Sequence, residues 1–210
     1  MGTRKQSLEL AKDRPLASLG LHALLTSPLT SVKVVVSPDD PGDWIAAAEG
    51  MADFAVSSAR LSQSIVSCAE SSKGMSYSIK QGVLEIIRDE PAADAVLIAL
   101  ADQPFISAAM IAELIHYWTR RPELDFVATA MRDARKKEIV LTPPAILSRS
   151  MFADLLELKG DAGARQLFRS PNFKGEGLVA ANEQALFDVD TPADLEWAKK
   201  YFSDRDCSAR

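Results

Sequence analysis

The sequence has only two cysteines among its 210 residues, Cys68 and Cys207, and they stand far apart without paired spacing. This pattern excludes a disulfide framework and a zinc site built on cysteine pairs, and it fits a reducing cytoplasm. The chain also lacks an apolar run near the roughly 20 residues of a membrane helix, and its start lacks the apolar core of a secretory signal. We therefore expect a cytoplasmic protein without a membrane partner.

An excess of positive charge is also missing. The chain has 24 Lys and Arg residues against 29 Asp and Glu residues, a formal net charge of -5. Proteins that bind nucleic acids normally present a basic face that displaces counterions from phosphates, so we expect no nucleic-acid partner. With 47% hydrophobic and 25% charged residues, the composition is that of a globular protein with an ordinary core. The length predicts one domain over residues 1–202 and a polar C-terminal tail over 203–210.

Predicted strands and helices alternate along the chain. Apolar or β-branched runs bounded by turn residues predict strands, and amphipathic or leucine-spaced stretches predict helices. Strands are expected at 31–37, 63–70, 95–101 and 124–131, and helices at 15–28, 44–56, 76–87 and 107–122. The stretch 143–158 predicts a strand and a helix, 159–171 a loop and a helix, and 184–202 a last strand, a turn and a helix. This alternation predicts an α/β fold with a doubly wound, mostly parallel sheet of the Rossmann-like kind.

The apolar run from Ala95 to Ala101 ends abruptly in Asp102, and Pro104 stiffens the turn behind it. A continuous apolar run is typical of a strand buried on both faces, and its carboxyl end emerges at one edge of a parallel sheet. Ligands of open α/β sheets bind at that edge. We therefore predict a functional role for Asp102. The structural alternative is that Asp102 caps the next helix, for which Ser107 is also a candidate N-cap.

A second acidic cluster, Asp188 and Asp190, stands where the last strand is expected to end. Carboxylates at neighbouring strand ends can hold Mg²⁺, which prefers oxygen ligands and usually bridges to substrate phosphates. We predict Asp102 and Asp190 as metal ligands. The structural alternative for Asp190 is a helix N-terminus, because Thr191 and Pro192 follow it.

Two glycine-containing loops are candidate ligand sites. In "KGMSYS", Gly74 would let a ligand approach the backbone, and Ser76 and Ser78 would offer hydrogen bonds beside a helix N-terminus. Capping of that helix by the serines is the structural alternative. In "KGDAGAR", Arg165 would place a cation near the sheet edge, and the alternative is that Asp161 caps a helix while the glycines form a turn.

The order of these pieces is more specific than any one of them. The segments "GMSYSIKQG", "VLIALADQPFIS", "PPAILSRSMFADLLELKGDAGARQLF" and "FDVDTPADLEWA" resemble, in sequence and spacing, the MobA-like nucleotidyltransferases that attach a nucleotide to molybdopterin. The similarity covers nearly the whole chain and is greatest to the molybdenum cofactor cytidylyltransferase branch. It implies a doubly wound α/β fold and Mg²⁺-dependent transfer of CMP or GMP from CTP or GTP to the terminal phosphate of the molybdopterin cofactor, with release of pyrophosphate.

The resemblance also implies roles for individual residues. "MGTRK" matches the last five positions of the family's phosphate-binding signature, "LAAGxSxRMGxxK", so Gly2 and Lys5 would be its second glycine and its lysine. Lys5 and Asp102 would then be catalytic, and Asp102 and Asp190 would hold the metal. The implied nucleotide-binding residues are Gly2, Lys5, Gly74, Ser76 and Ser78, and the implied acceptor-binding residues are Gly160, Asp161 and Arg165.

The chain departs from the family pattern in two places. The first strand, loop and arginine of the signature have no counterpart before Met1, so we expect the natural start to lie upstream. At "LTPPAIL", Thr142 and Pro143 replace a glycine and a histidine of the family, whereas Pro144 matches it.

Two other functions remain open on the sequence. One is a non-catalytic accessory protein that delivers the cofactor to a molybdoenzyme such as a xanthine dehydrogenase, which the incomplete signature favours. The other is a nucleotidyltransferase for a different phosphorylated small molecule. Retention of Lys5, Asp102 and Asp190 favours a catalyst over a carrier, because a carrier needs no phosphate-binding and metal-binding groups.

Overall fold

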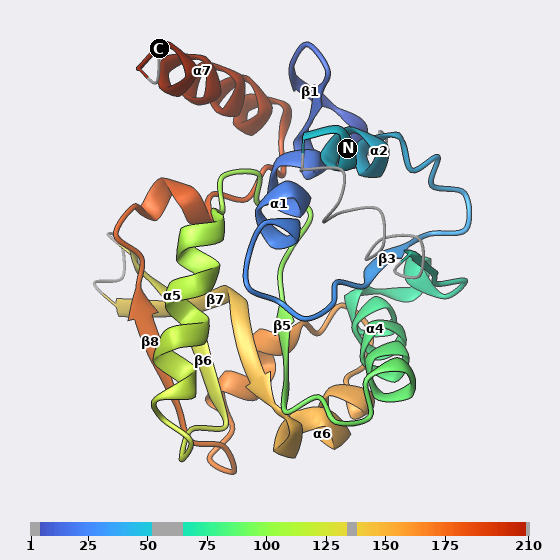
Figure 1. Cartoon of the computed structure of the whole chain (residues 1–210), viewed down its shortest axis with the longest axis vertical. Helices are drawn as coiled ribbons and strands as arrows, with labels where there is room; N and C mark the ends of the chain where they lie inside the picture. The colour runs from blue at the N-terminus through green and yellow to red at the C-terminus, as the bar shows by residue number, and fades with distance from the viewer. Residues whose placement is uncertain (1–4, 52–64, 134–137, 209–210) are drawn as a thin grey trace.

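The computed structural model describes residues 5–51, 65–133 and 138–208. Its main sheet has the strand order β5-β7-β6-β8 (Figure 1). The strands of this sheet are β5 (Ala95–Ile98), β6 (Phe126–Asp133), β7 (Glu138–Ser148) and β8 (Gly175–Val179). β7 runs antiparallel to β5 and β6, whereas β6 and β8 are parallel. Two smaller pairs are parallel β3 (Val34–Val36) with β4 (Ile65–Ser67) and antiparallel β1 (Glu9–Ala11) with β2 (Arg14–Pro15).

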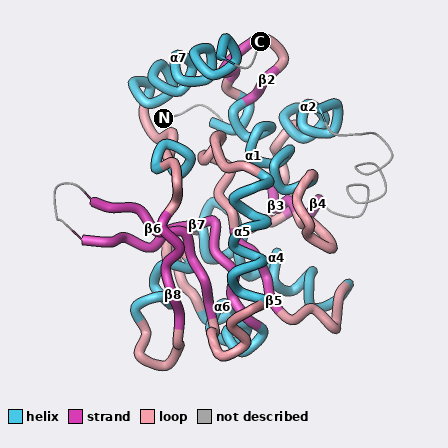
Figure 2. The backbone as a smooth tube through the Cα atoms, turned by 60° about the vertical axis from the view of Figure 1, so that its left-hand side comes forward, coloured by secondary structure: helices cyan, strands magenta, loops and turns pink. Residues whose placement is uncertain are grey.

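Helices cover both faces of the main sheet (Figures 1 and 2). These helices are α4 (Met75–Asp89) and α6 (Phe152–Glu157) on one side and α5 (Ala108–Thr119) on the other. Successive side chains of β6 alternate between the two sides, as a strand requires. Phe126 and Ala128 join the core cluster with Val83 of α4, whereas Val127 packs with Leu114 of α5. The predicted doubly wound α/β fold is thus confirmed, but the described sheet is mixed because β7 returns antiparallel.

Three more helices complete the fold. α1 (Leu16–Leu25) and α2 (Asp43–Met51) pack against β3, and α7 (Pro192–Ser208) lies near β1 at the far end from α6 (Figure 1). Short 3-10 turns are η1 (Lys5–Ser7), η2 (Ser71–Lys73), η3 (Arg149–Met151), η4 (Ala164–Arg169) and η5 (Glu183–Leu186). None of the helices in the described residues is long and apolar enough to cross a bilayer.

Two predicted features at the end of the chain differ from the structure. The last strand expected before Asp190 is wrong: residues 187–190 follow η5 as irregular backbone, although the Val189 N–H donates to the Asp102 carbonyl at 3.0 Å. α7 continues to Ser208, so residues 203–208 prolong the helix instead of forming a separate tail. No glycine or proline interrupts that polar stretch, so nothing in it stops the helix.

β8 was not predicted, because its sequence, "GEGLV", contains two glycines that usually weaken a strand. The structure explains both of them by close packing. A Cβ at Gly175 would lie 2.2 Å from the Phe126 ring, and a Cβ at Gly177 would lie 2.4 Å from a methyl carbon of Leu141. The glycines therefore let bulky side chains of β6 and β7 cover this strand.

Candidate active site

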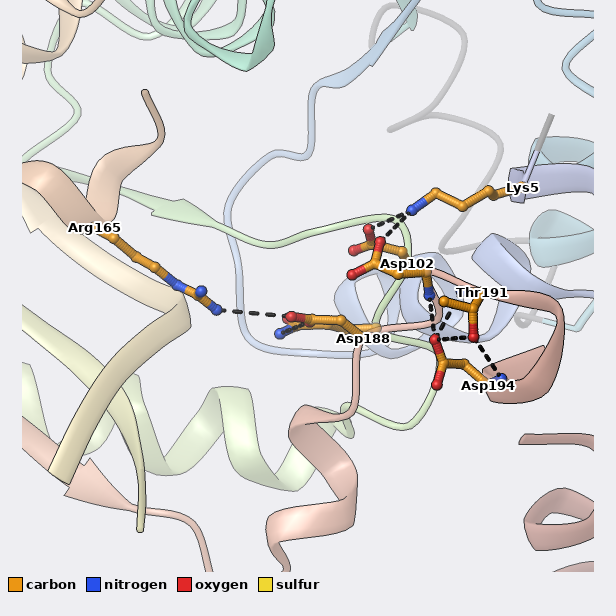
Figure 3. A network of polar contacts seen from close by, with 8 residues as sticks. Lys5, Asp102, Arg165, Asp188, Thr191 and Asp194 are labelled. Carbon is orange, nitrogen blue, oxygen red and sulfur yellow. Dashed lines mark hydrogen bonds and ion pairs between the residues drawn. The ribbon is translucent and has the colours of Figure 1, made fainter. Parts of the chain in front are cut away.

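Three residues that are far apart in the sequence meet at one point (Figure 3). The Lys5 Nζ donates to Asp102 Oδ2 at 3.1 Å and to Asp190 Oδ1 at 2.8 Å. One ammonium thus bridges two carboxylates. The predicted catalytic pair and the predicted metal ligands form a single cluster, while Gly2 lies outside the described residues.

The backbone on either side of the cluster holds the two carboxylates together. Asp102 follows the end of β5, and Asp190 precedes α7. The hydrogen bond from Val189 N–H to the Asp102 carbonyl ties these two segments directly. Just beyond Asp102, Phe105 packs edge-on against Tyr201 of α7, with ring centroids 4.8 Å apart. Burial of such aromatic contacts anchors α7, and with it Asp190, against the loop that carries Asp102.

The helices that follow the two carboxylates are capped by other side chains. Ser107 is the N-cap of α5, as predicted, and its Oγ accepts from the Met110 N–H at 3.2 Å. At the start of α7, Thr191 and Asp194 form a reciprocal capping box. The Asp194 Oδ2 accepts from the Thr191 N–H at 2.7 Å, and the Thr191 Oγ1 accepts from the Asp194 N–H at 3.2 Å. The Asp102 and Asp190 side chains are therefore available to Lys5.

The electrostatics of the cluster favour a cation between the carboxylates. Burial alone would lower the pKa of Lys5, but the hydrogen bonds and negative charges of Asp190 and Asp102 outweigh it and raise that pKa. Lys5 therefore stays charged at neutral pH. The other oxygen of Asp102, Oδ1, is buried and makes no hydrogen bond within the described residues. This oxygen retains the capacity to accept from a proton donor or to ligate a metal.

Two carboxylates suit a magnesium ion that also binds water and phosphate oxygens, because Mg²⁺ is usually held by one or two protein carboxylates. The described residues contain no group of three or more His, Cys, Asp or Glu side chains that could hold a metal alone. The donor set of Asp102 and Asp190 therefore fits an ion that arrives with a phosphate ligand better than a permanent structural metal.

A second polar network adjoins the cluster and contains Arg165. Its guanidinium donates to the Thr142 Oγ1. The same group lies 3.8 Å from an oxygen of Asp188 (Figure 3). The other Asp188 oxygen accepts from the Nε2 of Gln103 at 2.8 Å. Burial raises the pKa of Asp188, and the nearby charge of Asp102 adds to this, while Gln103 and Arg165 oppose it. Asp188 thus orients Arg165 instead of joining Lys5.

The two predicted loops lie against each other. The Ser76 N–H donates to the carbonyl of Gly160 at 3.1 Å. This backbone N–H in the first turn of α4 is thus paired with a backbone carbonyl, and no serine side chain caps the helix. Gly74 has φ 130°, and a Cβ there would lie 2.3 Å from the backbone carbon of Gly160. Only glycine permits this approach. Asp161 does not cap η4, whose N-cap is Gly163 without a side-chain hydrogen bond.

The serines of the first loop differ in their surroundings. Ser76 is fully buried, and its hydroxyl has no hydrogen-bond partner within the described residues. Ser78 is half-buried and lines a cleft between β3 and β5. The structure therefore brings Gly74 and Ser76 to Gly160, whereas Ser78 lines the cleft.

Sequence comparison identifies the family. A family model described as the MobA-like NTP transferase domain matches residues 1–176. The chain belongs to the MobA-like NTP transferase family. This membership makes it a nucleotidyltransferase and confirms the resemblance predicted from the ordered motifs.

One relative of this MobA-like protein and two solved structures illustrate the similarity. PucB of Bacillus subtilis, a purine catabolism protein, is 31% identical over 205 residues, which cover 97% of this chain and 91% of PucB. Rv0371c of Mycobacterium tuberculosis, in complex with manganese, aligns with a TM-score of 0.61 and 20% identity over 93% of this chain and 91% of its own. The 2-C-methyl-D-erythritol 4-phosphate cytidylyltransferase of Thermus thermophilus aligns with a TM-score of 0.63 and 15% identity. This alignment covers 95% of the present chain and 94% of the cytidylyltransferase chain. The two structural likenesses show the fold alone.

Sequence reasoning did not single out Gln103 in this MobA-like chain, although the residue lies between Asp102 and Pro104 in the "LADQP" motif. Its side chain is fully buried, which is rare for a glutamine and requires a polar partner. That partner is Asp188, and no spacing rule in the sequence links the two residues. Thr142 was noted only as a departure from the family, and its contact with Arg165 was not predicted.

Proposed function

We propose that this protein transfers CMP or GMP from CTP or GTP to the terminal phosphate of the molybdopterin cofactor and releases pyrophosphate. The observation that carries the proposal is the meeting of Lys5 with Asp102 and Asp190. A lysine and two carboxylates at one point are what a triphosphate with its divalent cation requires, because the cation needs oxygen ligands and the phosphates need a positive partner.

In this proposal Asp102 and Asp190 hold a divalent ion, and the manganese complex of Rv0371c supports the choice of a divalent metal. When bound, the ion neutralises charge on the phosphate oxygens. Lys5 then donates its ammonium hydrogens to phosphate oxygens and stabilises the negative charge that builds on the leaving pyrophosphate. A lysine is protonated at neutral pH at its ordinary pKa, and the neighbouring carboxylates raise the pKa of Lys5 further.

The chain's remaining task is to align the two substrates. A phosphate oxygen of the acceptor attacks the α-phosphorus, a new P–O bond forms, and the bond to the β-phosphate oxygen breaks with its electrons leaving on pyrophosphate. No protein nucleophile is needed. Arg165, held by Thr142 and Asp188, is our candidate for the acceptor's phosphate.

The two contacting loops would lie on either side of the reacting phosphates. We assign the nucleotide to the loop of Gly74, Ser76 and Ser78, and the acceptor to that of Gly160 and Asp161. Because Ser76 is buried, its loop would meet the nucleotide through backbone groups. The direct contact of Gly74 with Gly160 supports this arrangement, since it keeps the two half-sites at a fixed spacing.

The test is to incubate the protein with molybdopterin cofactor, Mg²⁺ and either CTP or GTP, and to measure the dinucleotide and the pyrophosphate formed. We expect both products with one triphosphate, and a loss of about a hundredfold or more in Asp102→Asn. Glu157→Gln removes an exposed carboxylate on α6 and is the matched control, with unchanged product. Absence of dinucleotide with either triphosphate, or full activity of Asp102→Asn, would contradict the proposal.

A second candidate is delivery of the molybdenum cofactor to a molybdoenzyme such as a xanthine dehydrogenase. The name of PucB as a purine catabolism protein favours it, because xanthine oxidation is a step in purine breakdown. A pull-down of cofactor-loaded protein with an apo molybdoenzyme, with enzyme activation as the readout, separates the two. Activation that needs no triphosphate supports delivery, and activation only after dinucleotide formation supports transfer.

A further inference from the structure

Gln103 follows Asp102 directly in the chain, and its side chain is fully buried. The Nε2 group donates to the Oδ1 of Asp188 at 2.8 Å. The Oε1 atom is also buried and accepts no hydrogen bond within the described residues. Burial of an amide with only one of its two ends paired costs free energy, so hydrophobic packing does not account for a glutamine at this position.

The backbone around Gln103 is held by contacts that do not involve its side chain. The Val189 N–H donates to the Asp102 carbonyl at 3.0 Å, and the aromatic contact of α7 with the loop after Asp102 joins the same two segments. The Gln103 side chain acts instead on the side chain of Asp188. Because Oδ1 of that carboxylate is held by Nε2, the direction of its second oxygen, Oδ2, is fixed as well.

That second oxygen of Asp188 faces Arg165 of η4, as Figure 3 shows, and lies 3.8 Å from its Nη2. The same Nη2 donates to the Oγ1 of Thr142, which is fully buried in β7. The Thr142 carbonyl in turn accepts from the Oγ1 of Thr129 at 2.7 Å, so this second support is also fixed. The guanidinium is thus held through one nitrogen by two groups, and each group is held by a buried side chain.

The other nitrogens of the Arg165 guanidinium are left for a ligand. Within the described residues, no hydrogen bond or ion pair joins its Nε or Nη1 to another group. These N–H groups suit a phosphate, which accepts several charge-assisted hydrogen bonds. The Arg165 side chain is about half exposed, so without support it would lose much rotamer freedom on binding a ligand. Holding Nη2 in advance removes part of that entropic cost.

We propose that Gln103 is a positioning residue for the acceptor: through Asp188 it fixes the Arg165 guanidinium so that Nε and Nη1 meet the acceptor's phosphate. The assignment of the acceptor rests on the proposed function. Gln103 itself touches no substrate. An amide suits this task because it donates a hydrogen bond without adding a charge, whereas a lysine would place a second ammonium among the carboxylates. The loop that carries Asp102 would therefore also set the arginine of the acceptor.

The order of the Arg165 side chain tests this proposal without reference to activity. ¹⁵N NMR of the arginine Nε–H groups reports that order, and the Arg165 signal is identified by its loss in Arg165→Lys. Its order parameter should fall by about 0.2 or more in Gln103→Leu and in Gln103→Met, two apolar replacements of similar size. Gln81→Leu is the matched control with no expected change, because it removes an amide that donates to Glu85 within α4.

Transfer kinetics on the same variants test the consequence for the acceptor. KM for the acceptor should rise about tenfold in Gln103→Leu, whereas kcat and KM for the triphosphate should stay within about twofold. In an Arg165→Lys background, Gln103→Leu should add less than about twofold to KM, because both changes act through one group. The melting temperature should stay within about 4 °C of the wild type, since other contacts hold the backbone.

The outcomes separate this proposal from the proposed function. Absence of transfer in the wild type contradicts the proposed function, and the order of Arg165 still decides whether Gln103 positions it. An unchanged order parameter in both Gln103 variants would overturn the proposal. So would equal rises in KM for both substrates, or independent losses in the double variant, because these indicate a structural role. Lower order of Arg165 with a rise in KM confined to the acceptor supports the proposal.

Discussion

Replacing Lys5 by methionine should tighten the binding of a divalent cation in the absence of nucleotide while abolishing transfer. The Lys5 ammonium stands 3.1 Å from the Asp102 carboxylate and 2.8 Å from the Asp190 carboxylate. Methionine keeps an apolar stem of similar length but removes the charge. The two carboxylates then remain negative with no ammonium between them, so the substitution removes the competitor of an incoming cation.

The size of this effect follows from Coulomb's law and from exposure. Two unit charges about 4 Å apart interact by about 1 kcal/mol in water and about 4 kcal/mol near a protein surface. The side chains of Lys5 and Asp102 are 27% and 26% exposed and that of Asp190 is 65% exposed, so solvent screens the interaction strongly. We therefore expect a gain of about 1 to 2 kcal/mol, a factor of roughly 5 to 30 in cation affinity.

The assay is a manganese titration by isothermal calorimetry at low salt, with transfer activity measured on the same samples. Lys73→Met is the matched control, because Lys73 is exposed and pairs with Glu70 far from the cluster in sequence. Its manganese affinity should equal that of the wild type. If Lys5→Met binds manganese as tightly as the wild type or more weakly, the Lys5 ammonium does not occupy the position at which a divalent cation binds.

Three other substitutions test the surroundings of the cluster. Gly74→Ala should lower the free energy of unfolding, measured with urea, by about 3 kcal/mol or more, because φ at Gly74 is 130° and a Cβ there would overlap the backbone of Gly160. Gly50→Ala is the control: Gly50 lies in α2 with open space around it, so this substitution should raise the free energy of unfolding by about 0.5 to 1 kcal/mol. Burial raises the pKa of Asp188 in the folded state, so its protonated form favours folding at low pH and this contribution is lost as pH rises through the folded-state pKa. Asp188→Asn should therefore gain stability relative to the wild type as pH rises above the usual titration range of an aspartate. Arg165→Lys should raise KM for the acceptor more than it lowers kcat, because lysine lacks the planar guanidinium that can donate two parallel hydrogen bonds to a phosphate.

Each of these expectations has a clear contrary result. Gly74→Ala as stable as Gly50→Ala would mean that the two loops do not meet. A stability difference between Asp188→Asn and the wild type that does not change with pH would show that Asp188 titrates as an exposed carboxyl does. An Arg165→Lys variant with an unchanged KM for the acceptor would remove Arg165 from the acceptor site.

The parts of the site that local sequence determines could be predicted. Asp102 stood out because an apolar run ends in a charge, and Ser107 because an N-cap residue precedes an amphipathic helix. Helices on both faces of the sheet followed from the alternation of elements. Family resemblance added Lys5, whose isolated sequence context carries no signal of phosphate binding.

The parts that depend on tertiary packing could not be predicted. The glycines of β8 favour a loop when only the local sequence is considered. They are needed because a Cβ at either position would overlap Phe126 or Leu141, and these residues belong to other strands. The pairing of Gln103 with Asp188 joins residues 85 positions apart, so no local pattern marks it. For Asp190, the sequence left a metal ligand and a helix start open. The structure places Asp190 just before α7, where Thr191 and Asp194 form the capping box and the Asp190 side chain accepts from Lys5.

The central claim is that Lys5, Asp102 and Asp190 together bind a triphosphate with its metal. The most direct test is the change in melting temperature of the protein with CTP and with GTP, each with and without Mg²⁺. Ligand that binds only the folded state stabilises it by about 2.7 kcal/mol at a hundred times Kd. We predict a rise with one triphosphate and Mg²⁺ that disappears in Asp102→Asn and persists in Glu157→Gln. A rise of equal size in Asp102→Asn, or no rise with either triphosphate, would contradict the claim.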